Sequence, residues 1–179
     1  MQQTKLHLGC GTKHINNYTN IDIRYQPGVD EVNNVKYLRN YRENTVDTIY
    51  ACHVLEHFGR WEYKVALRRW FELLKPGGVL RISVPDFEKI VSVYTSTGSL
   101  SNIMGFLYGG QDYAENCHYS CWDFNSLAAD LKECGFVSVD RYDWRTVEHS
   151  QVDDYSQAYI PHMDKENGLH MCLNVEAVK

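Results

Sequence analysis

The sequence predicts an α/β fold with a mostly parallel sheet, and three observations carry that prediction. An apolar strand at residues 5–8 runs straight into a turn that contains two glycines. Residues 46–84 have the pattern of a strand, a helix and a strand, which implies parallel strands joined by a right-handed crossover. Two alternating runs, at residues 136–145 and 169–178, predict a closing antiparallel hairpin. We therefore expect a mostly parallel sheet with helices on both faces.

Length and composition fit one globular domain that covers residues 1–179. Hydrophobic residues make up 44% and charged residues 23% of the chain, close to the averages for globular proteins. The net charge of -5 provides no basic surface for nucleic acid or for an anionic membrane. We therefore expect a small or neutral substrate, with no nucleic-acid partner and no membrane partner.

The chain has no targeting pattern and no strong metal-binding pattern. No apolar run approaches the roughly 20 residues of a membrane span, and the polar start lacks a signal peptide's apolar core, so a cytoplasmic location is expected. The six cysteines are scattered and would remain thiols in a reducing compartment. Cys117, His118 and Cys121 offer ligand atoms, but no second ligand pair stands at zinc-finger spacing. No metal site is therefore expected.

Gly9 and Gly11 follow the first strand and suit a ligand that lies against the main chain. Without a Cβ, both can adopt backbone angles closed to other residues and can let a ligand approach closely. The dinucleotide fingerprint needs a third glycine where this chain has His14, so a nucleoside ligand without a pyrophosphate fits better. Asp22 ends the next apolar run, and its carboxylate can accept hydrogen bonds from both hydroxyls of a ribose.

The connection between the first two strands is short. Residues 12–19 are fewer than the dozen or so residues that a parallel crossover needs, so either the helix between these strands shrinks to about one turn or the two strands are arranged differently. A third strand is expected at the sheet edge, over residues 35–38. The β-branched and aromatic side chains of residues 46–52 predict a central strand, which delivers His53, Glu56 and His57 just past its end.

The clearest helical pattern spans residues 61–75. Its apolar side chains stand at helical spacing, and the Pro-Gly-Gly sequence at residues 76–78 ends it. A strand follows at residues 79–84, and Asp86 is expected to cap the next helix. The core positions expected in the two helices are Trp61, Val65, Leu67, Trp70, Phe71 and Leu74 in the first and Phe87, Ile90, Val91 and Tyr94 in the second.

The C-terminal half is less regular. A helix is expected near residues 100–107, and Asp123 or Asn125 can cap another helix that stops at Gly135. Between the two alternating runs, residues 149–168 show no strong periodicity. Loops of that length inside compact domains are usually functional or disordered.

Taken together, these segments resemble the class I S-adenosylmethionine-dependent methyltransferases, whose fold is Rossmann-like. The matching segments are residues 6–12, 20–23, 47–57, 73–80 and 131–136, which in order and spacing cover most of residues 5–145. The chain is most similar to small methyltransferase-like proteins with a shortened first helix, some of them from surface-glycan gene groups. The resemblance implies S-adenosylmethionine as the cofactor and a mostly parallel sheet closed by an antiparallel hairpin.

The resemblance also implies a set of cofactor-binding residues. The glycine turn would lie beside the methionyl part, Asp22 would bind the ribose, and the end of the fourth strand would line the methyl-donor pocket. The residues implied are Leu8, Gly9, Cys10, Gly11, Asp22, Ile23, Ala51, Cys52 and His53. One departure concerns the adenine. The family often has an acidic residue near the third strand, where this chain has Tyr37, Leu38 and Arg39, so adenine would be held by backbone contacts and stacking.

The expected activity is methyl transfer to a small-molecule or sugar acceptor, such as a glycan precursor, at an oxygen atom. His57 and His118 are the candidate general bases for a hydroxyl acceptor. The long segment at residues 149–168 is expected to form a lid on the substrate side, with His149, Asp154, Tyr155, Tyr159 and His162 as the substrate contacts. Plainer interpretations are hydrogen-bonded histidines at a helix start, and a surface flap or a homodimer contact at residues 149–168.

Two other functions stay open at this point. The shortened first helix and the missing acidic residue for adenine fit a module that binds the cofactor without catalysis. A nicotinamide-dependent oxidoreductase is disfavoured by the absent third glycine. A comparison of the binding of the two cofactors would separate an oxidoreductase from a methyltransferase.

Overall fold

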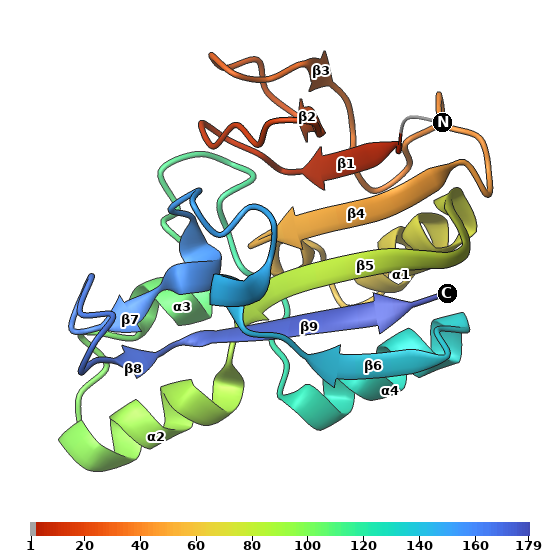
Figure 1. Cartoon of the computed structure of the whole chain (residues 1–179). Helices are drawn as coiled ribbons and strands as arrows, with labels where there is room; N and C mark the ends of the chain where they lie inside the picture. Colours follow the sequence, from red (N-terminus) through yellow and green to blue (C-terminus); the bar gives the residue numbers. More distant parts are fainter. Residues whose placement is uncertain (1–2) are drawn as a thin grey trace.

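The structure, a computed structural model, describes residues 3–179, and its main feature is a seven-stranded sheet (Figure 1). The strands lie across the sheet in the order β3-β2-β1-β4-β5-β9-β6. Their bounds are β1 Lys5–Leu8, β2 Thr19–Asp22, β3 Glu31–Val32, β4 Val46–Cys52, β5 Leu74–Pro85, β6 Ser138–Arg141 and β9 Cys172–Val178. A separate two-stranded sheet consists of β7 Tyr159–Ile160 and β8 Leu169–His170.

The predicted pairing of the two C-terminal runs is confirmed. β9 runs antiparallel to both β5 and β6, whereas β1 to β5 pair in parallel. β6 is therefore parallel to the main set, so β6 ends and β9 begins at the edge where the parallel strands have their carboxyl ends. Residues 142–171 emerge at this edge, which is the edge where ligands of open α/β sheets bind.

The helices within the described residues are α1 Glu62–Leu73, α2 Phe87–Thr97, α3 Met104–Tyr108 and α4 Phe124–Cys134, with short 3-10 turns at η1 Leu55–His57, η2 Trp144–Thr146 and η3 Tyr155–Gln157. The Asp86 side chain accepts from the Glu88 amide, and the Asp123 side chain accepts from the Ser126 amide, as the cap predictions require. No helix of residues 3–179 is long and apolar enough to cross a membrane.

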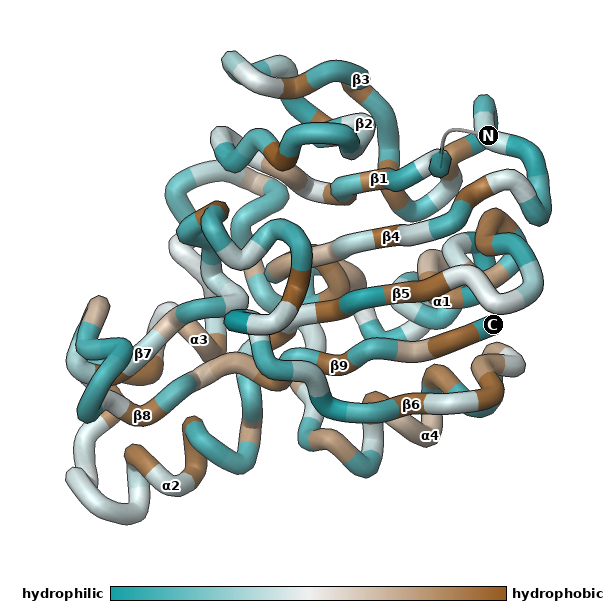
Figure 2. The backbone as a smooth tube through the Cα atoms, viewed as in Figure 1, coloured by the Kyte–Doolittle hydropathy of each residue, from teal (hydrophilic) through white to brown (hydrophobic). Residues whose placement is uncertain are grey.

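One face of the sheet is packed by α1 and α4, which contact each other and lie behind the strands in Figure 1. Trp70 of α1 is fully buried there, and its indole N–H donates to the Val35 carbonyl at 2.8 Å. Figure 2 shows the hydrophobic residues along the central strands. Side chains on this face include Leu6, Leu8, Ile49, Ala51, Leu80, Leu67, Leu127 and Leu131.

The opposite face carries no α-helix among residues 3–179, so the expectation of helices on both faces is wrong. Residues 12–18 form turns, as their small number predicted, and leave no room for a crossover helix. Instead Ile15 and Tyr18 from this connection pack with Tyr50, Cys52 and Val152 over the sheet. The buried layer on this face is rich in polar side chains, namely His7, Asn20, Ser83, His149 and Asn174.

Several local predictions were wrong. Residues 35–38 form a turn, and the edge strand is β3. The helix expected at residues 100–107 is only α3. Five expected core side chains are exposed, because both helices present only one narrow stripe to the interior: they are Trp61, Val65, Phe87, Val91 and Tyr94. α2 instead buries Ile90 and Val93, which pack with Met171 beyond the carboxyl ends of the strands.

Candidate active site

The glycine turn and Asp22 meet at the carboxyl ends of β1 and β2. The Gly11 amide donates to Oδ2 of Asp22 at 2.8 Å, and the Arg24 amide donates to Oδ1 at 2.9 Å. A carboxylate has about four lone-pair sites, so each oxygen keeps capacity for a further donor. Because Asp22 is only 8% exposed and accepts these two hydrogen bonds, its carboxylate is oriented before any ligand binds.

The two glycines of the turn have different surroundings. Both have positive φ, +63° at Gly9 and +53° at Gly11. A Cβ on Gly9 would stand 2.4 Å from Cγ2 of Val54, whereas a Cβ on Gly11 would meet no heavy atom within 4 Å. Gly9 therefore lets β1 pack against the residues that follow β4. Gly11 presents bare backbone to open space, which is the surface that a nucleoside ligand needs.

Cys10 is a packed side chain rather than a nucleophile. It is 3% exposed, and burial together with the nearby Asp22 carboxylate raises the pKa of its thiol to about 12. Leu8 and Ala51 are also fully buried and form the floor beneath the turn, whereas Ile23 is 46% exposed. The predicted cofactor residues thus divide into a buried support and an open surface.

The chain after β4 leaves the sheet through a strained residue. His53 has a φ of +51°, a region that residues other than glycine seldom adopt, and its amide donates to the Ser83 carbonyl at 2.8 Å. Its Nδ1 lies 3.0 Å from Oε1 of Glu56, which is fully buried. Burial alone would lower the pKa of His53, but the attraction of Glu56 outweighs burial and raises it. The pKa of Glu56 is lowered although burial opposes this, because His53 attracts the carboxylate.

His57 and His118, the two candidate bases, are brought together although they are far apart in the chain. Their ring centroids lie 4.8 Å apart with the planes nearly perpendicular. Nδ1 of His57 lies 3.1 Å from the Cys117 carbonyl oxygen, and Nδ1 of His118 lies 2.9 Å from the Phe106 carbonyl oxygen. Burial lowers the pKa of His118, with nearby Glu56 opposing the shift, so this ring is neutral at pH 7.

Residues 109–121 form a strap across the carboxyl edge, which the sequence analysis did not find. The Tyr119 amide donates to the Glu56 carbonyl at 2.8 Å, and the Arg24 guanidinium stacks 3.4 Å from the Tyr113 ring centroid. The strap therefore contacts the ends of both β2 and β4. The tyrosines of this segment show no periodic spacing, so its amino-acid composition is the only sequence feature that could have indicated a strap.

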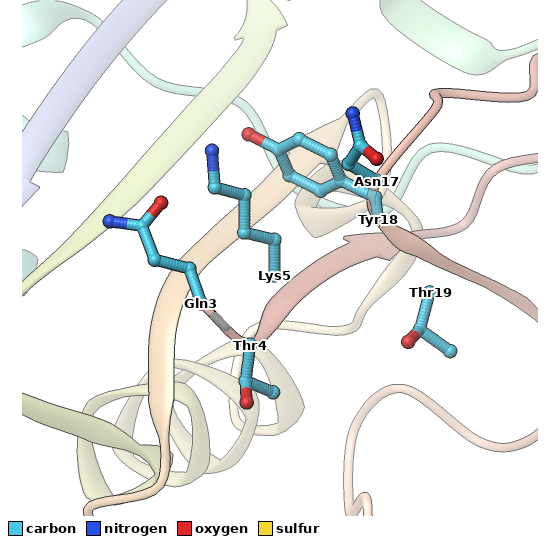
Figure 3. Close-up of a pocket in the computed structure, with 6 residues that line it drawn as sticks. All are labelled: Gln3, Thr4, Lys5, Asn17, Tyr18 and Thr19. Atoms are coloured by element: carbon cyan, nitrogen blue, oxygen red, sulfur yellow. The ribbon is translucent and has the colours of Figure 1, made fainter. Parts of the chain in front are cut away.

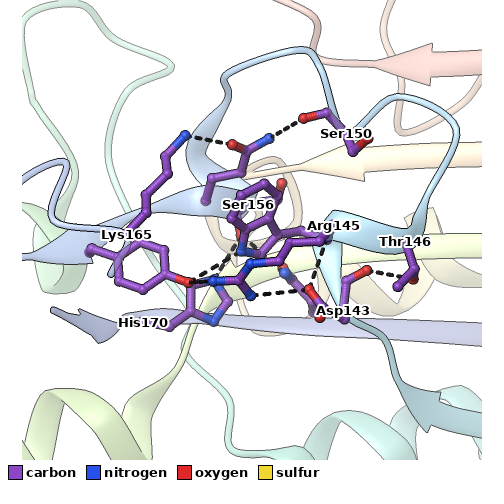
Figure 4. Close-up of polar contacts among 11 residues, drawn as sticks. Asp143, Arg145, Thr146, Ser150, Ser156, Lys165 and His170 are labelled. Atoms are coloured by element: carbon purple, nitrogen blue, oxygen red, sulfur yellow. Dashed lines mark hydrogen bonds and ion pairs between the residues drawn. The ribbon is translucent and has the colours of Figure 1, made fainter. Parts of the chain in front are cut away.

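Residues 142–171 are folded rather than an open loop (Figure 4). Within them, the Arg145 guanidinium donates to the Tyr159 hydroxyl at 3.0 Å, and the Ser156 carbonyl lies 2.8 Å from Nε2 of His170. The Tyr50 hydroxyl of β4 donates to Asp154 at 2.7 Å, which ties the segment to the sheet.

The predicted substrate contacts in this segment do not lie on one surface. His149 is 4% exposed and Tyr159 is 7% exposed, because their rings pack against Tyr50 and His170, respectively. The expectation that these two side chains face an acceptor is therefore not met in this conformation. Tyr155 is 66% exposed and its ring lies 5.2 Å from that of His53, and His162 is also exposed.

The residues expected near the adenine also lie elsewhere than the sequence analysis placed them. Tyr37, Leu38 and Arg39 belong to the turn that packs on α1, and Leu38 is fully buried. The residue that follows β3 is Asn33, and its backbone N–H donates to the backbone carbonyl of Asp22 at 2.9 Å. The short strand β3 has no hydrophobic pattern, so the sequence alone could not identify Asn33.

A surface pocket lies at the opposite edge of the sheet (Figure 3). Its walls come from the amino ends of β1 and β2, and its lining residues are Gln3, Thr4, Lys5, Asn17, Tyr18 and Thr19. Ligands of parallel sheets bind at the carboxyl ends. This pocket is therefore separate from the glycine turn and from the end of β4.

Comparison with known proteins agrees with this geometry. The family model of a methyltransferase domain matches residues 6–140. A methyltransferase from Archaeoglobus fulgidus, described as dependent on S-adenosylmethionine (SAM), has a similar structure with a TM-score of 0.62 at 14% identity, over 99% of this chain and 86% of that chain. The 1,6-didemethyltoxoflavin-N1-methyltransferase of Burkholderia thailandensis gives a TM-score of 0.61 at 18% identity, over 98% of this chain and 70% of that chain. The comparison with curated proteins found no match.

The family match and the site define a class of protein. The chain belongs to the methyltransferase domain family, which confirms the resemblance to the class I S-adenosylmethionine-dependent methyltransferases. S-adenosylmethionine is accordingly its cofactor, and the residues at the carboxyl edge fit that cofactor in one specific respect. Gly11 presents open backbone beside a carboxylate that is already oriented.

Proposed function

We propose that the chain transfers a methyl group from S-adenosylmethionine to a hydroxyl oxygen of a small-molecule acceptor, such as a sugar or another glycan precursor. The observation that carries the proposal is the contact between Gly11 and the Asp22 carboxylate at the carboxyl edge of the sheet. It supplies an oriented acceptor for ribose hydroxyls next to bare backbone. A sulfonium donor needs no pyrophosphate site, and this turn offers none.

In this proposal, each part of the carboxyl edge has its own role. The backbone at residues 9–11 lies along the methionyl part, and Asp22 accepts from the ribose hydroxyls. Ile23 covers the ribose and adenine. The side-chain nitrogen of Asn33 donates to Glu31 and Asn40, so its side-chain oxygen accepts from the adenine amino group. Leu8, Cys10, Ala51 and Cys52 shape the floor from below. His53 stands where the methyl group is presented.

The acceptor is proposed to enter between the strap and the chain after β4. His57 and His118 offer nitrogen lone pairs there, and the exposed rings of Tyr155 and His162 suit a polyhydroxyl molecule. Methyl transfer requires the acceptor oxygen in line with the methyl carbon and the sulfur. Orientation of this kind contributes about 7–11 kcal/mol, whereas a general base adds about 10²–10⁴-fold in rate.

Calorimetric titration with S-adenosylmethionine and with S-adenosylhomocysteine tests the cofactor half of the proposal. We expect Asp22→Ala to weaken binding at least about tenfold, because each charge-assisted hydrogen bond lost costs about 1.5–3 kcal/mol. Asp140→Ala on β6 is the matched control, because Asp140 is exposed and β6 lies at the other end of the strand order from β2. Equal affinities in the two variants, with intact folds, would contradict the assignment of Asp22.

A cofactor-binding module without catalysis is the second candidate. One observation favours it: residues 142–171 bury His149 and Tyr159, and Tyr159 accepts from Arg145 within the same segment. A panel of sugars and sugar phosphates, assayed for release of S-adenosylhomocysteine, separates the two. Turnover on any of them supports the methyltransferase, and tight cofactor binding without turnover on the whole panel supports the module. Binding of NAD in preference to S-adenosylmethionine would reject both.

A further inference from the structure

Three side chains with metal-ligating atoms converge at the end of β4. Glu56 and His57 come from η1, and His118 comes from the strap. One ligand atom from each lies within 4.8 Å of the other two. A tetrahedral zinc with bonds of about 2.0–2.1 Å holds its ligand atoms about 3.3 Å apart. Shifts of about 1 Å in side chains therefore suffice to close this cluster around an ion.

The hydrogen bond that each histidine makes through Nδ1 leaves its Nε2 available to a ligand. A carbonyl oxygen only accepts, so Nδ1 of His57 must donate its proton to Cys117 and Nδ1 of His118 must donate to Phe106. In each ring Nε2 is then the nitrogen that this hydrogen bond does not use, and on the neutral ring of His118 it carries the lone pair. Histidines that bind metals commonly donate their other N–H to a backbone carbonyl in this way, which fixes the ring and its tautomer.

Glu56 is a carboxylate with a close ionic partner, His53, at only one of its two oxygens. It is fully buried, and neither side-chain oxygen has a partner of hydrogen-bond geometry in the described part of the chain. The nearest imidazole nitrogens are Nδ1 of His53, 3.0 Å from Oε1, and Nε2 of His118, 4.0 Å from Oε1. Burial of an ionised carboxylate is costly unless it is paired or coordinates a metal. An ion beside Oε2 would add a second partner, with His53 orienting the carboxylate through Oε1.

From these contacts we infer that Glu56, His57 and His118 form a binding site for a divalent transition metal ion. Two imidazole nitrogens and one carboxylate oxygen are the ligand set of catalytic zinc sites, which keep a coordination position open for water or substrate. The backbone allows the same arrangement, because a Cβ on Gly109 would stand 2.5 Å from the Asn116 carbonyl oxygen and 3.0 Å from Cδ2 of His118. Glycine at that position allows the His118 ring to lie where it does.

The inference departs from the sequence expectation of no metal, and the chain order explains why. The ligands come from segments about 60 residues apart, so no spacing motif exists. Of the three side chains that the sequence offers in this segment, Cys117, His118 and Cys121, only His118 belongs to the proposed site. Cys117 contributes its carbonyl to His57, and Cys121 is exposed.

A metal at this place would have a role in the proposed methyl transfer, and this role depends on that proposed function. The open coordination position would bind the acceptor hydroxyl and lower its pKa, so that its proton passes to solvent. The oxygen would then attack the methyl carbon of the sulfonium, and the carbon–sulfur bond would break. Its electron pair stays on sulfur and gives neutral S-adenosylhomocysteine. The imidazoles would act as ligands, with the metal taking over the task of a general base.

The test is metal binding by the full chain, independent of activity. Protein stripped with a chelator is titrated with Zn²⁺ by calorimetry and with Co²⁺ by visible absorption. We expect one equivalent to bind, with the ligand-field bands of nitrogen and oxygen ligation and without a thiolate charge-transfer band. His118→Ala and the isosteric Glu56→Gln should each weaken binding at least about 100-fold, since loss of an outer-shell partner alone costs 10–100-fold.

Controls make each outcome decisive. Cys121→Ser, in the same strap, should bind the metal as the unaltered chain does, and circular dichroism with titration of S-adenosylmethionine verifies the fold of every variant. Binding lost in Cys121→Ser, or retained in both ligand variants, would overturn the inference, as would absence of binding to the unaltered chain. If S-adenosylmethionine fails to bind while the metal binds, the proposed function fails and the metal site stands. Full methyl transfer in the presence of a chelator would reject a role of the metal in the reaction.

Discussion

Gly9 and Gly11 allow a test in which two chemically identical substitutions have opposite consequences. Both residues have positive φ, so alanine at either position forces an L side chain into a left-handed conformation, which costs about 1–2 kcal/mol. Only at Gly9 does the new Cβ also collide with a neighbour, at 2.4 Å from Cγ2 of Val54. Overpacking of this kind adds about 1–3 kcal/mol. Gly9→Ala should therefore destabilise the fold by about 2–5 kcal/mol, and Gly11→Ala by about 1–2 kcal/mol.

Cofactor binding should show the reverse order of sensitivity. The Cβ of Gly11→Ala projects into the open space where the cofactor is proposed to lie, so its affinity for S-adenosylmethionine should fall about tenfold, or about 1.4 kcal/mol. Urea denaturation of the free protein gives the stabilities, and calorimetry gives the affinities. A third variant, Val54→Ala, completes a double-mutant cycle with Gly9→Ala. Relief of the collision should make the double variant more stable than the sum of the single effects, by at least about 1 kcal/mol.

Two results would refute the reasoning. If both alanine variants lost the same stability, the contact between Gly9 and Val54 would carry no energy. If Gly11→Ala kept full affinity for S-adenosylmethionine, the open space beside its backbone would not be the cofactor site.

Three further predictions concern the polar face and the core. Burial lowers the pKa of His149 to about 4 from its ordinary 6.5, so the unfolded chain binds this proton first as the pH falls, and the free energy of unfolding should drop by about 2 kcal/mol from pH 7 to pH 5. His149→Phe, measured by urea denaturation at both pH values, should lose most of that dependence; the charged and titratable groups that face the ring are Asp154, Arg81, Glu148 and His7. Asp154→Ala should destabilise the chain by about 1–3 kcal/mol in thermal unfolding, because the buried Tyr50 hydroxyl loses its acceptor, and an unchanged melting temperature would contradict the contact. Trp70→Phe should cost about 1–3 kcal/mol by the same measurement, since it leaves the Val35 carbonyl unpaired and a void beside α1, whereas a change below about 0.5 kcal/mol would show that neither matters.

Local sequence patterns predicted the parts of the fold that depend on neighbouring residues. The strand before Gly9, the Asp22 carboxylate, the central strand at residues 46–52 and the caps Asp86 and Asp123 are all encoded within a few positions. The turn in place of the first helix was predicted from the small number of residues between β1 and β2. The family and its cofactor followed from the order of these segments.

The missed features depend on contacts between distant segments. The approach of His118 to His57 joins two parts of the chain that no local period connects. The exposure of Phe87 and Val91 was missed because apolar spacing cannot tell an inner stripe from an outer one when both carry apolar residues. β3 has only two residues, so it has no pattern to find. The burial of His149 depends on Tyr50, which lies about a hundred positions earlier.

The helix-free face of the sheet has a consequence for how the protein can diverge. The Tyr18 hydroxyl, next to β2, donates to Glu148 at 2.6 Å, and Lys5 of β1 donates to the same carboxylate at 2.8 Å. The segments that lead to the glycine turn and to Asp22 are therefore hydrogen-bonded to residues 142–171, which are proposed to flank the acceptor. In a protein with a helix between these layers, the acceptor segment can be exchanged without disturbing the cofactor loop. Here the two must change together, so grafting residues 142–171 from a relative onto this chain is expected to alter cofactor affinity as well as acceptor choice.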